Sequence, residues 1–128
     1  MQRPVELILA RQWCALLTTP VLLFEPDGTL VYFNEAAAAL LGRTYGESGG
    51  LTRAVWQAAF RMEDTLGASL SQDDNPLARA LDDGIPAQAQ VVLRGMDGEL
   101  RTLQVTSVPL GSLSQAKLGI MALLHEVR

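Results

Sequence analysis

Short apolar blocks alternate with turn-forming residues in the first third of the chain. The blocks 21–24 (VLLF) and 30–33 (LVYF) enclose the segment EPDG, in which Pro26 presets φ and Gly28 tolerates a left-handed conformation. Each block has the length and the aliphatic and aromatic composition of a buried strand. The pattern predicts two strands that are joined by a reverse turn.

A small helix is predicted immediately after the second strand. The segment 35–41 (EAAAALL) is rich in alanine and leucine, which favour helix. Asn34 precedes it and is suited to the N-cap, because its side-chain oxygen accepts a free backbone N–H. Gly42 follows it and is suited to close its C-terminal end. We therefore expect a hairpin that leads into a capped helix.

Upstream of the hairpin, residues 5–17 carry apolar side chains at helical spacing. Pro4 suits the first turn of this helix, and the segment Thr18–Pro20 ends it. The apolar stripe is wider than one packing surface needs, so the helix is either buried on two sides or contacts a second chain. A dimer contact is the favoured interpretation and burial against the sheet of the same chain is the alternative. The candidate dimer residues are Val5, Ile8, Leu9, Trp13 and Leu16.

Two further helices are predicted in the middle of the chain. The first covers 51–62, and its apolar face consists of Leu51, Val55, Ala58, Ala59 and Met62. The second begins with Asn75 as N-cap and Pro76 as first helical residue, and the segment Asp82–Gly84 ends it. Its inward side chains are expected to be Leu77, Ala80 and Leu81.

The last third of the chain is predicted to consist of three strands, over 87–94, 100–108 and 117–127. The last of them contains GIMALL, which is apolar on both faces, as in a central strand. The order of helix, two strands, helices and three strands predicts an α+β fold, with a five-stranded antiparallel sheet flanked by short helices. We expect one domain over 21–128, preceded by an N-terminal amphipathic helix within 1–20.

Composition places the chain among globular proteins and narrows its partners. It has 128 residues, 48% of them hydrophobic and 19% charged, with a net charge of −4. Its basic residues are scattered, so no concentrated patch is available for nucleic acid. Its longest apolar runs are far shorter than the ~20 residues that cross a membrane, and no signal peptide is recognisable. The single cysteine excludes an intrachain disulfide. We expect a cytoplasmic protein, or the cytoplasmic part of a larger one.

Catalytic and metal-binding patterns are not recognisable in the sequence. The one histidine, His125, is expected to be a partly exposed strand residue, and Cys14 a small packing residue. One histidine and one cysteine do not make a zinc site or a nucleophilic pair. Three acidic pairs occur, at 63–64, 73–74 and 82–83, but neighbouring acids of this kind are usually solvated or placed at helix ends. We expect no enzyme activity and no metal.

Several segments taken in order resemble the PAS domain family. The first is LLFEPDGTLVYFNEAAAALLG, in which a strand, an acidic-Gly turn, a strand ending in Asn and a small-residue helix follow one another. The second is NPLARALDDGIPAQAQVVLRGMDGELRTLQVTSVPL, followed by LGIMALLHEV. The resemblance spans about 21–127 and is poor over 43–74. It implies a curved sheet whose concave face and flanking helices enclose a pocket.

The resemblance also implies which side chains point into that pocket. Flavin-binding photosensors of the family carry a cysteine in a central helix, whereas Cys14 lies far upstream. Leu93, Leu103 and Met121 are apolar where cofactor-binding relatives place polar residues, so flavin is not expected. Haem-binding relatives place their axial histidine on a helix beside the pocket, whereas His125 lies near the end of the last strand, so haem is not expected either. A small apolar ligand suits the predicted pocket better, and a core that is simply filled is the alternative. The candidate pocket residues are Leu22, Phe24, Phe33, Leu77, Leu81, Val91, Leu93, Leu103, Val105, Met121 and Leu123.

The family implies a sensory and signal-transduction module that is non-catalytic and forms a homodimer. Its expected output is a domain or partner such as a histidine kinase, phosphatase, cyclase or transcription factor. In the family, an acid-aliphatic-Thr/Ser step at the end of the last strand couples to the next segment. Here Glu126–Arg128 keeps the acid and the aliphatic residue but ends in arginine. The alternatives are a protein-interaction domain with a filled core and a small-ligand enzyme on a similar α+β scaffold.

Overall fold

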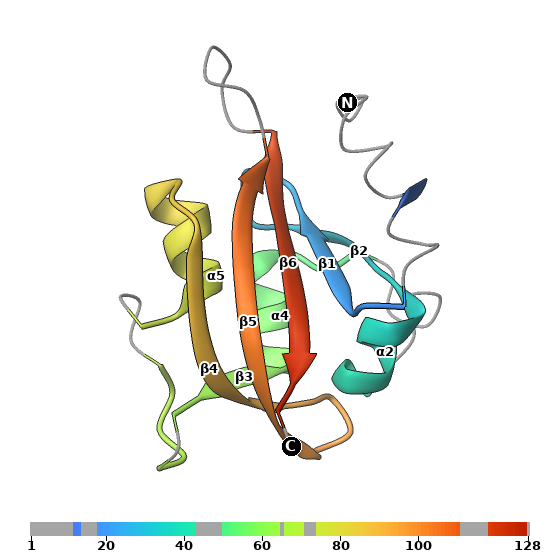
Figure 1. Cartoon of the computed structure of the whole chain (residues 1–128), viewed down its shortest axis with the longest axis vertical. Helices are drawn as coiled ribbons and strands as arrows, with labels where there is room; N and C mark the ends of the chain where they lie inside the picture. Colours follow the sequence, from blue (N-terminus) through green and yellow to red (C-terminus); the bar gives the residue numbers. More distant parts are fainter. Residues whose placement is uncertain are drawn as a thin grey trace.

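The computed structural model describes residues 12–13, 18–42, 50–64, 66–70, 74–110 and 118–127. Within these residues, six strands form one antiparallel sheet in the order β2-β1-β6-β5-β4-β3, and short helical segments cover it (Figure 1). The strands are β1 (Val21–Phe24), β2 (Leu30–Phe33), β3 (Arg61–Glu63), β4 (Ala87–Arg94), β5 (Leu100–Leu110) and β6 (Gly119–Glu126). The helical segments are α2 (Glu35–Leu41), α4 (Arg53–Ala59), α5 (Pro76–Ala78) and the π-helical η1 (Arg79–Asp83). The predicted α+β fold is confirmed.

The last strand, β6, occupies the middle of the sheet, as its two apolar faces predict. It pairs with β1 on one side, where Val21 is opposite Leu123, and with β5 on the other, where Val105 is opposite Leu124. Strands from the two ends of the described domain thus lie side by side. β6 is shorter than the predicted 117–127. β5 runs two residues beyond the predicted end at Val108.

Two hairpins use the same Asp-Gly turn. In the first, the N–H of Gly28 donates to the carbonyl of Glu25 (2.9 Å) and Oδ1 of Asp27 accepts from the N–H of Thr29 (2.9 Å). In the second, which joins β4 to β5, the corresponding bonds are 3.0 Å each and Asp97 accepts from the N–H of Glu99. The glycines adopt φ of 94° and 83°, which favour a residue without a Cβ. The turn N–H groups also lower the pKa of Asp27 and of Asp97.

Asn34 caps α2, as predicted, and also fixes the start of β1. Its Oδ1 accepts from the N–H of Ala37 (3.0 Å) and of Val21 (3.1 Å), and its Nδ2 donates to the carbonyl of Thr19 (2.7 Å). Gly42 ends α2 with φ of 81° and donates its N–H to Ala38. The hairpin, the capped helix and their boundaries are therefore confirmed.

The prediction of one helix over 51–62 is wrong in extent and in orientation. Leu51 pairs with Leu30 through two backbone hydrogen bonds of 2.7 and 2.9 Å, so it belongs to the edge of the sheet. The helix is only α4, and its inward residue is Trp56, which is 4% exposed, whereas Val55 is 50% exposed. The large indole side chain buries more apolar area than valine, so it determines which helical face turns inward.

The sixth strand arises from the end of that predicted helix. Residues 61–63 form β3, in which Met62 is opposite Leu93 of β4. The backbone N–H and C=O groups at the end of β4 need hydrogen-bond partners, and β3 supplies them. The two strands are about 30 residues apart in sequence, so a local sequence pattern does not indicate this pairing. The predicted number of five strands is therefore too low by one.

The sheet separates two apolar clusters. The larger lies on the inner face, beneath the helices, and the smaller lies on the outer face around Val21, Leu23 and Val31. Met121 and Leu123 pack against the outer cluster, so their predicted inward orientation is wrong. β6 is apolar on both faces, so its sequence gives no signal for which alternate residues point inward. The inward residues of β6 are Ile120, Ala122 and Leu124.

Candidate functional site

The inner face of the sheet brings together all but two of the predicted pocket residues. They are buried in one cluster that contains Leu22, Phe24, Phe33, Leu77, Leu81, Val91, Leu93, Leu103 and Val105. The side chains of Ile120, Ala122 and Leu124 take the place predicted for Met121 and Leu123. Apolar side chains from all six strands of the sheet and from the helical segments thus face one another in the described part of the chain. Such a surface favours apolar molecules and offers few partners to a polar ring system.

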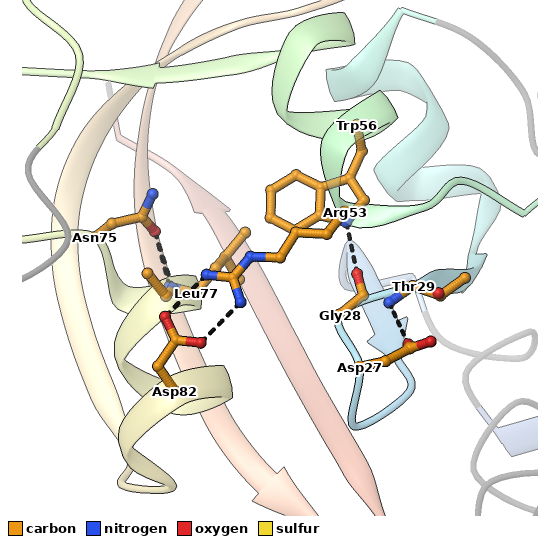
Figure 2. A network of polar contacts seen from close by, with 9 residues as sticks. Asp27, Gly28, Thr29, Arg53, Trp56, Asn75, Leu77 and Asp82 are labelled. Carbon is orange, nitrogen blue, oxygen red and sulfur yellow. Dashed lines mark hydrogen bonds and ion pairs between the residues drawn. The ribbon is translucent and has the colours of Figure 1, made fainter.

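Trp56 of α4 attaches that helix to the first hairpin. Its Nε1 donates to the carbonyl of Gly28 at 2.7 Å (Figure 2). Its ring stacks on Phe60, with centroids 5.6 Å apart, and meets Phe24 edge-on at 5.4 Å. The indole therefore joins α4, the β1–β2 turn and the inner face of the sheet. Trp56 and Phe60 were not among the predicted site residues, although two aromatic residues four positions apart on a helix are a signal of a shared face.

Arg53, also in α4, joins the helix to the far side of the inner face. Its Nη1 and Nη2 donate to Oδ1 and Oδ2 of Asp82 at 2.8 and 2.9 Å (Figure 2). This two-point geometry is the strongest that a guanidinium and a carboxylate form. The hydrogen bonds from Arg53 to Asp82 raise the pKa of Arg53 above its ordinary value. The acidic pair at 82–83 thus contributes one side chain to an ion pair between α4 and η1.

The segment that carries Asp82 has an unusual helical geometry. Asn75 caps α5, accepting from the N–H groups of Leu77 (2.9 Å) and Ala78 (3.3 Å), as predicted. The chain then widens into the π-helical η1 and ends at Gly84, with φ of 69°. Short π-helical segments occur frequently at functional sites. Leu77, Ala80 and Leu81 point inward, which confirms the predicted face.

Among the described residues, one buried polar side chain on the inner face has no partner. Ser107 of β5 is 0% exposed, and its Oγ makes no hydrogen bond within the described part of the chain. Asn34 and Glu63, the other polar side chains buried in the described ranges, both have partners. A buried hydroxyl without a partner is costly, so it marks a position where a polar atom would be stabilised.

A sequence model of the family described as the PAS fold matches residues 16–128. The chain belongs to the PAS fold family. No curated protein matches the chain in a comparison of sequences. The family assignment accounts for the sheet, its central last strand and the helices over its inner face.

Solved PAS structures share the fold at low sequence identity. A Rhodobacter sphaeroides LOV protein superposes with a TM-score of 0.73 at 16% identity, over 97% of this chain and 67% of that chain. The PAS domain of the fruit-fly ELK potassium channel gives 0.72 at 12% identity, over 98% of both chains. The PAS domain of Bordetella pertussis BvgS gives 0.63 at 16% identity, over 95% of this chain and 85% of that chain. The chain thus spans about two thirds of the LOV protein.

Two surface pockets of this PAS domain lie outside the predicted residues. One, of about 700 Å³, is open and is lined by Thr18–Pro20, two residues of α2 and the end of β6 with His125. The other, of about 200 Å³, lies between α4 and β3 and is lined in part by Trp56, Phe60 and Leu70. None of the eleven predicted pocket residues lines either pocket. His125 is an exposed residue of β6, which confirms its predicted position.

The acidic pair at 63–64 divides between an ion-pair cluster and a turn. Glu63 is 2% exposed, and its Oε2 accepts from Nε of Arg94 (3.2 Å) and Nη2 of Arg61 (3.3 Å). The hydrogen bond from Arg94, and then that from Arg61, hold the pKa of Glu63 below its ordinary value. Asp64 accepts from the N–H groups of Leu66 and Ala68 in a turn. Among the described residues, no group of His, Cys, Asp and Glu side chains is arranged to hold a metal ion.

The predicted dimer residues fall mostly outside the described residues. This applies to Val5, Ile8, Leu9 and Leu16, and to Cys14. Trp13 is described, and it is 70% exposed. No helix in the described ranges is long and apolar enough to cross a membrane.

Proposed function

We propose that this PAS domain is a non-catalytic sensory module that binds a small apolar ligand, dimerises and regulates an output domain or a partner protein. Candidate outputs are a histidine kinase, a phosphatase, a cyclase or a transcription factor, in the cytoplasm. The observation that carries the proposal is the apolar inner face, which is covered by helical segments held mainly through side-chain contacts. Arg53–Asp82 and Trp56–Gly28 are contacts of this kind. Such contacts exchange between two arrangements more readily than the backbone pairing of the sheet.

Ligand binding would act by shifting the balance between these arrangements. A ligand that contacts the inner face more favourably when α4 and η1 are displaced stabilises the displaced state by the difference in affinity. The change reaches the rest of the protein through β6, which is central in the sheet and ends at Glu126. In a dimer, this structural change would reach the second chain if the dimer interface includes a helix or strand that contacts the sheet.

The inner face favours an apolar ligand over haem or flavin. Leu93 and Leu103 are fully buried there, and the exposed His125 lies outside that cluster. A flavin ring would bury several polar atoms against these leucines without hydrogen-bond partners. We therefore propose that this domain carries neither cofactor.

Dimerisation is proposed through the N-terminal residues 5–16. Trp13 supports the proposal, because an exposed indole is a large apolar surface that a second chain would cover. Aromatic residues of this kind contribute strongly to protein interfaces.

A second candidate function is a protein-interaction domain without a ligand. The complete burial of Leu22, Leu77, Leu103 and Val105 favours it, because a core in which these side chains pack directly against one another leaves little room. Signalling would then depend on surfaces outside the inner face, such as the open pocket beside His125.

Native mass spectrometry of the freshly purified protein tests these functions together, since it reports subunit number and retained small molecules. We expect a dimer that carries added mass, and a Trp13→Glu variant that is monomeric. Leu66→Glu is the matched control, because Leu66 is also a large exposed apolar residue but lies in a turn far from residues 5–16 in sequence. A dimer at bare mass that takes up no added apolar compound favours the interaction domain. A wild-type monomer contradicts dimerisation through the N-terminal residues.

A further inference from the structure

Ser107 is a hydroxyl on an otherwise apolar inner face. It follows Leu103 and Val105 at alternate positions of β5, and all three side chains are 0% exposed. Its Oγ has no hydrogen-bond partner among the described residues. A hydroxyl group can donate one hydrogen bond and accept two, and burying it without replacing its hydrogen bonds to water is unfavourable. An alanine at this position would pack on the same face without that penalty.

Small side chains surround this hydroxyl in the sheet. Ser107 is opposite Ala122 on β6 and Ala87 on β4. The segment η1 packs against β5 and β6, and its Ala80 is fully buried. Elsewhere on the inner face, most of the buried strand residues are leucine, valine, isoleucine and phenylalanine. The cross-strand neighbours of Ser107 therefore have less side-chain volume than those of Val105, which are Ala89 and Leu124.

The segment η1, which packs against β5 and β6, is also held by a side chain of another helix. η1 is π-helical, and its Asp82 binds Arg53 of α4 through two hydrogen bonds. Most of the other contacts that η1 makes inward are apolar. An outward shift of η1 would break one ion pair that is partly exposed, which is a small penalty in water.

From these contacts we infer that Ser107 binds the single polar atom of a mainly apolar ligand, with η1 covering it. The ligand class is an aliphatic or aromatic molecule that carries one hydroxyl or carbonyl oxygen. Its oxygen bonds Oγ of Ser107 between Ala122 and Ala80, and its apolar body contacts the leucines and valines of the inner face. A charged group is disfavoured, because Arg101, which alternates with Leu103 and Val105 on β5, is already bound to the Leu40 carbonyl and to Asp97. This inference rests on the proposed ligand-binding function and specifies the contact that selects the ligand.

Phenol and toluene are suitable probes, because they have nearly the same shape and differ by a hydroxyl against a methyl group. Both are titrated into the full chain, and amide chemical shifts of β5, β6 and η1 report binding by nuclear magnetic resonance. The proteins compared are the wild type, Ser107→Ala and the control Thr106→Val. Thr106 is the neighbouring hydroxyl on the outer face of β5, where it accepts from Nε2 of Gln88 at 3.0 Å.

The quantity to compare is the ratio of the toluene Kd to the phenol Kd, because hydration differences between the probes cancel between variants. We expect this ratio to fall about fivefold in Ser107→Ala, as for loss of one hydrogen bond, and to stay unchanged in Thr106→Val. We also expect ligand-free Ser107→Ala to melt at a higher temperature than the wild type, because it removes an unpaired buried hydroxyl.

Two results would overturn the inference in distinguishable ways. If both probes bind and the ratio is the same in Ser107→Ala, the ligand-binding function stands but Ser107 does not select the ligand. If neither probe shifts the amides of the inner face in the wild type, the ligand-binding function fails together with this inference. A lower melting temperature for Ser107→Ala would mean that the hydroxyl is already paired, which also contradicts it.

Discussion

Arg53 and Asp82 are 29 residues apart in sequence, yet their side chains form two parallel hydrogen bonds of 2.8 and 2.9 Å. The pair connects α4 to η1, the two segments that carry inward residues Trp56 and Leu81. It is thus a side-chain link between helical segments that cover the same apolar face (Figure 2).

Breaking this link should loosen η1 more than it destabilises the whole domain. A double-mutant cycle with Arg53→Met and Asp82→Asn should give a coupling free energy of about 0.5–1 kcal/mol, the range for a well-oriented pair that is partly exposed. Urea unfolding measures it, and high salt should reduce it. Amide hydrogen exchange in η1 should be faster in either single variant than in the wild type.

Asp83→Asn is the control, because Asp83 is exposed and forms no ion pair in the described ranges. Equal acceleration in Asp83→Asn would contradict the link.

Trp56 should be required for stability through its nitrogen as well as its ring. Trp56→Phe removes the donor to the buried carbonyl of Gly28 and reduces the ring that contacts Phe24. We expect a loss of about 1–3 kcal/mol in the free energy of unfolding, measured with urea. Trp13→Phe is the matched change at an exposed indole and should stay within about 0.5 kcal/mol. Similar losses in both variants would mean that the Gly28 contact contributes little.

Gly42 should be far less replaceable than Gly98, although both have positive φ, of 81° and 83°. A Cβ on Gly42 would lie 2.5 Å from Cγ of Asp97 and 2.8 Å from its backbone nitrogen, whereas a Cβ on Gly98 meets nothing within 4 Å. Gly98→Ala should cost about 1–2 kcal/mol from backbone strain alone. Gly42→Ala should cost more, because the turn of the second hairpin must move from α2. Thermal unfolding of both variants tests the difference, and equal losses would contradict it.

Acid should weaken the contact between Glu63 and its two arginines. Because Arg94 and Arg61 hold the pKa of Glu63 below its ordinary value of 4.5, the contribution to stability is present above that pH and is lost as the pH falls further. The urea concentration at the unfolding midpoint of the wild type should therefore decrease as the pH is lowered from about 5 to about 3. Glu63→Gln should flatten this dependence, and Arg94→Met should do so in large part, because Arg94 is the main cause. An unchanged slope in Glu63→Gln would assign the acid sensitivity to other carboxylates.

The parts of the fold that depend on neighbours in sequence were predicted from the sequence. The hairpin at 21–33, the Asn34 cap and the Gly42 terminus were placed correctly, because turns and caps are satisfied by groups within a few residues. The inward positions Leu77, Ala80 and Leu81 followed from helical spacing in the same way. Strand alternation placed Val91 and Leu93 correctly on β4, which has one polar face.

Errors arose where the outcome depended on a partner distant in sequence. Residues 61–63 read as the end of a helix, but backbone pairing with β4 made them a strand. The inward residues of β6 could not be chosen, since both of its faces are apolar and each contacts a different cluster. Trp56 and Asp82 gave no local sign of their partners, Gly28 and Arg53.

The sequence alone therefore determined the order of most elements and the apolar character of the interior, because spacing, capping and turn chemistry are local properties. The resemblance of its ordered segments indicated the family. Only the tertiary structure decided the sixth strand, the orientation of β6, the side-chain link between Arg53 and Asp82, and the isolation of the Ser107 hydroxyl. Each of these depends on which distant groups meet across the sheet, and burial and hydrogen-bond pairing are settled only when the whole chain has packed.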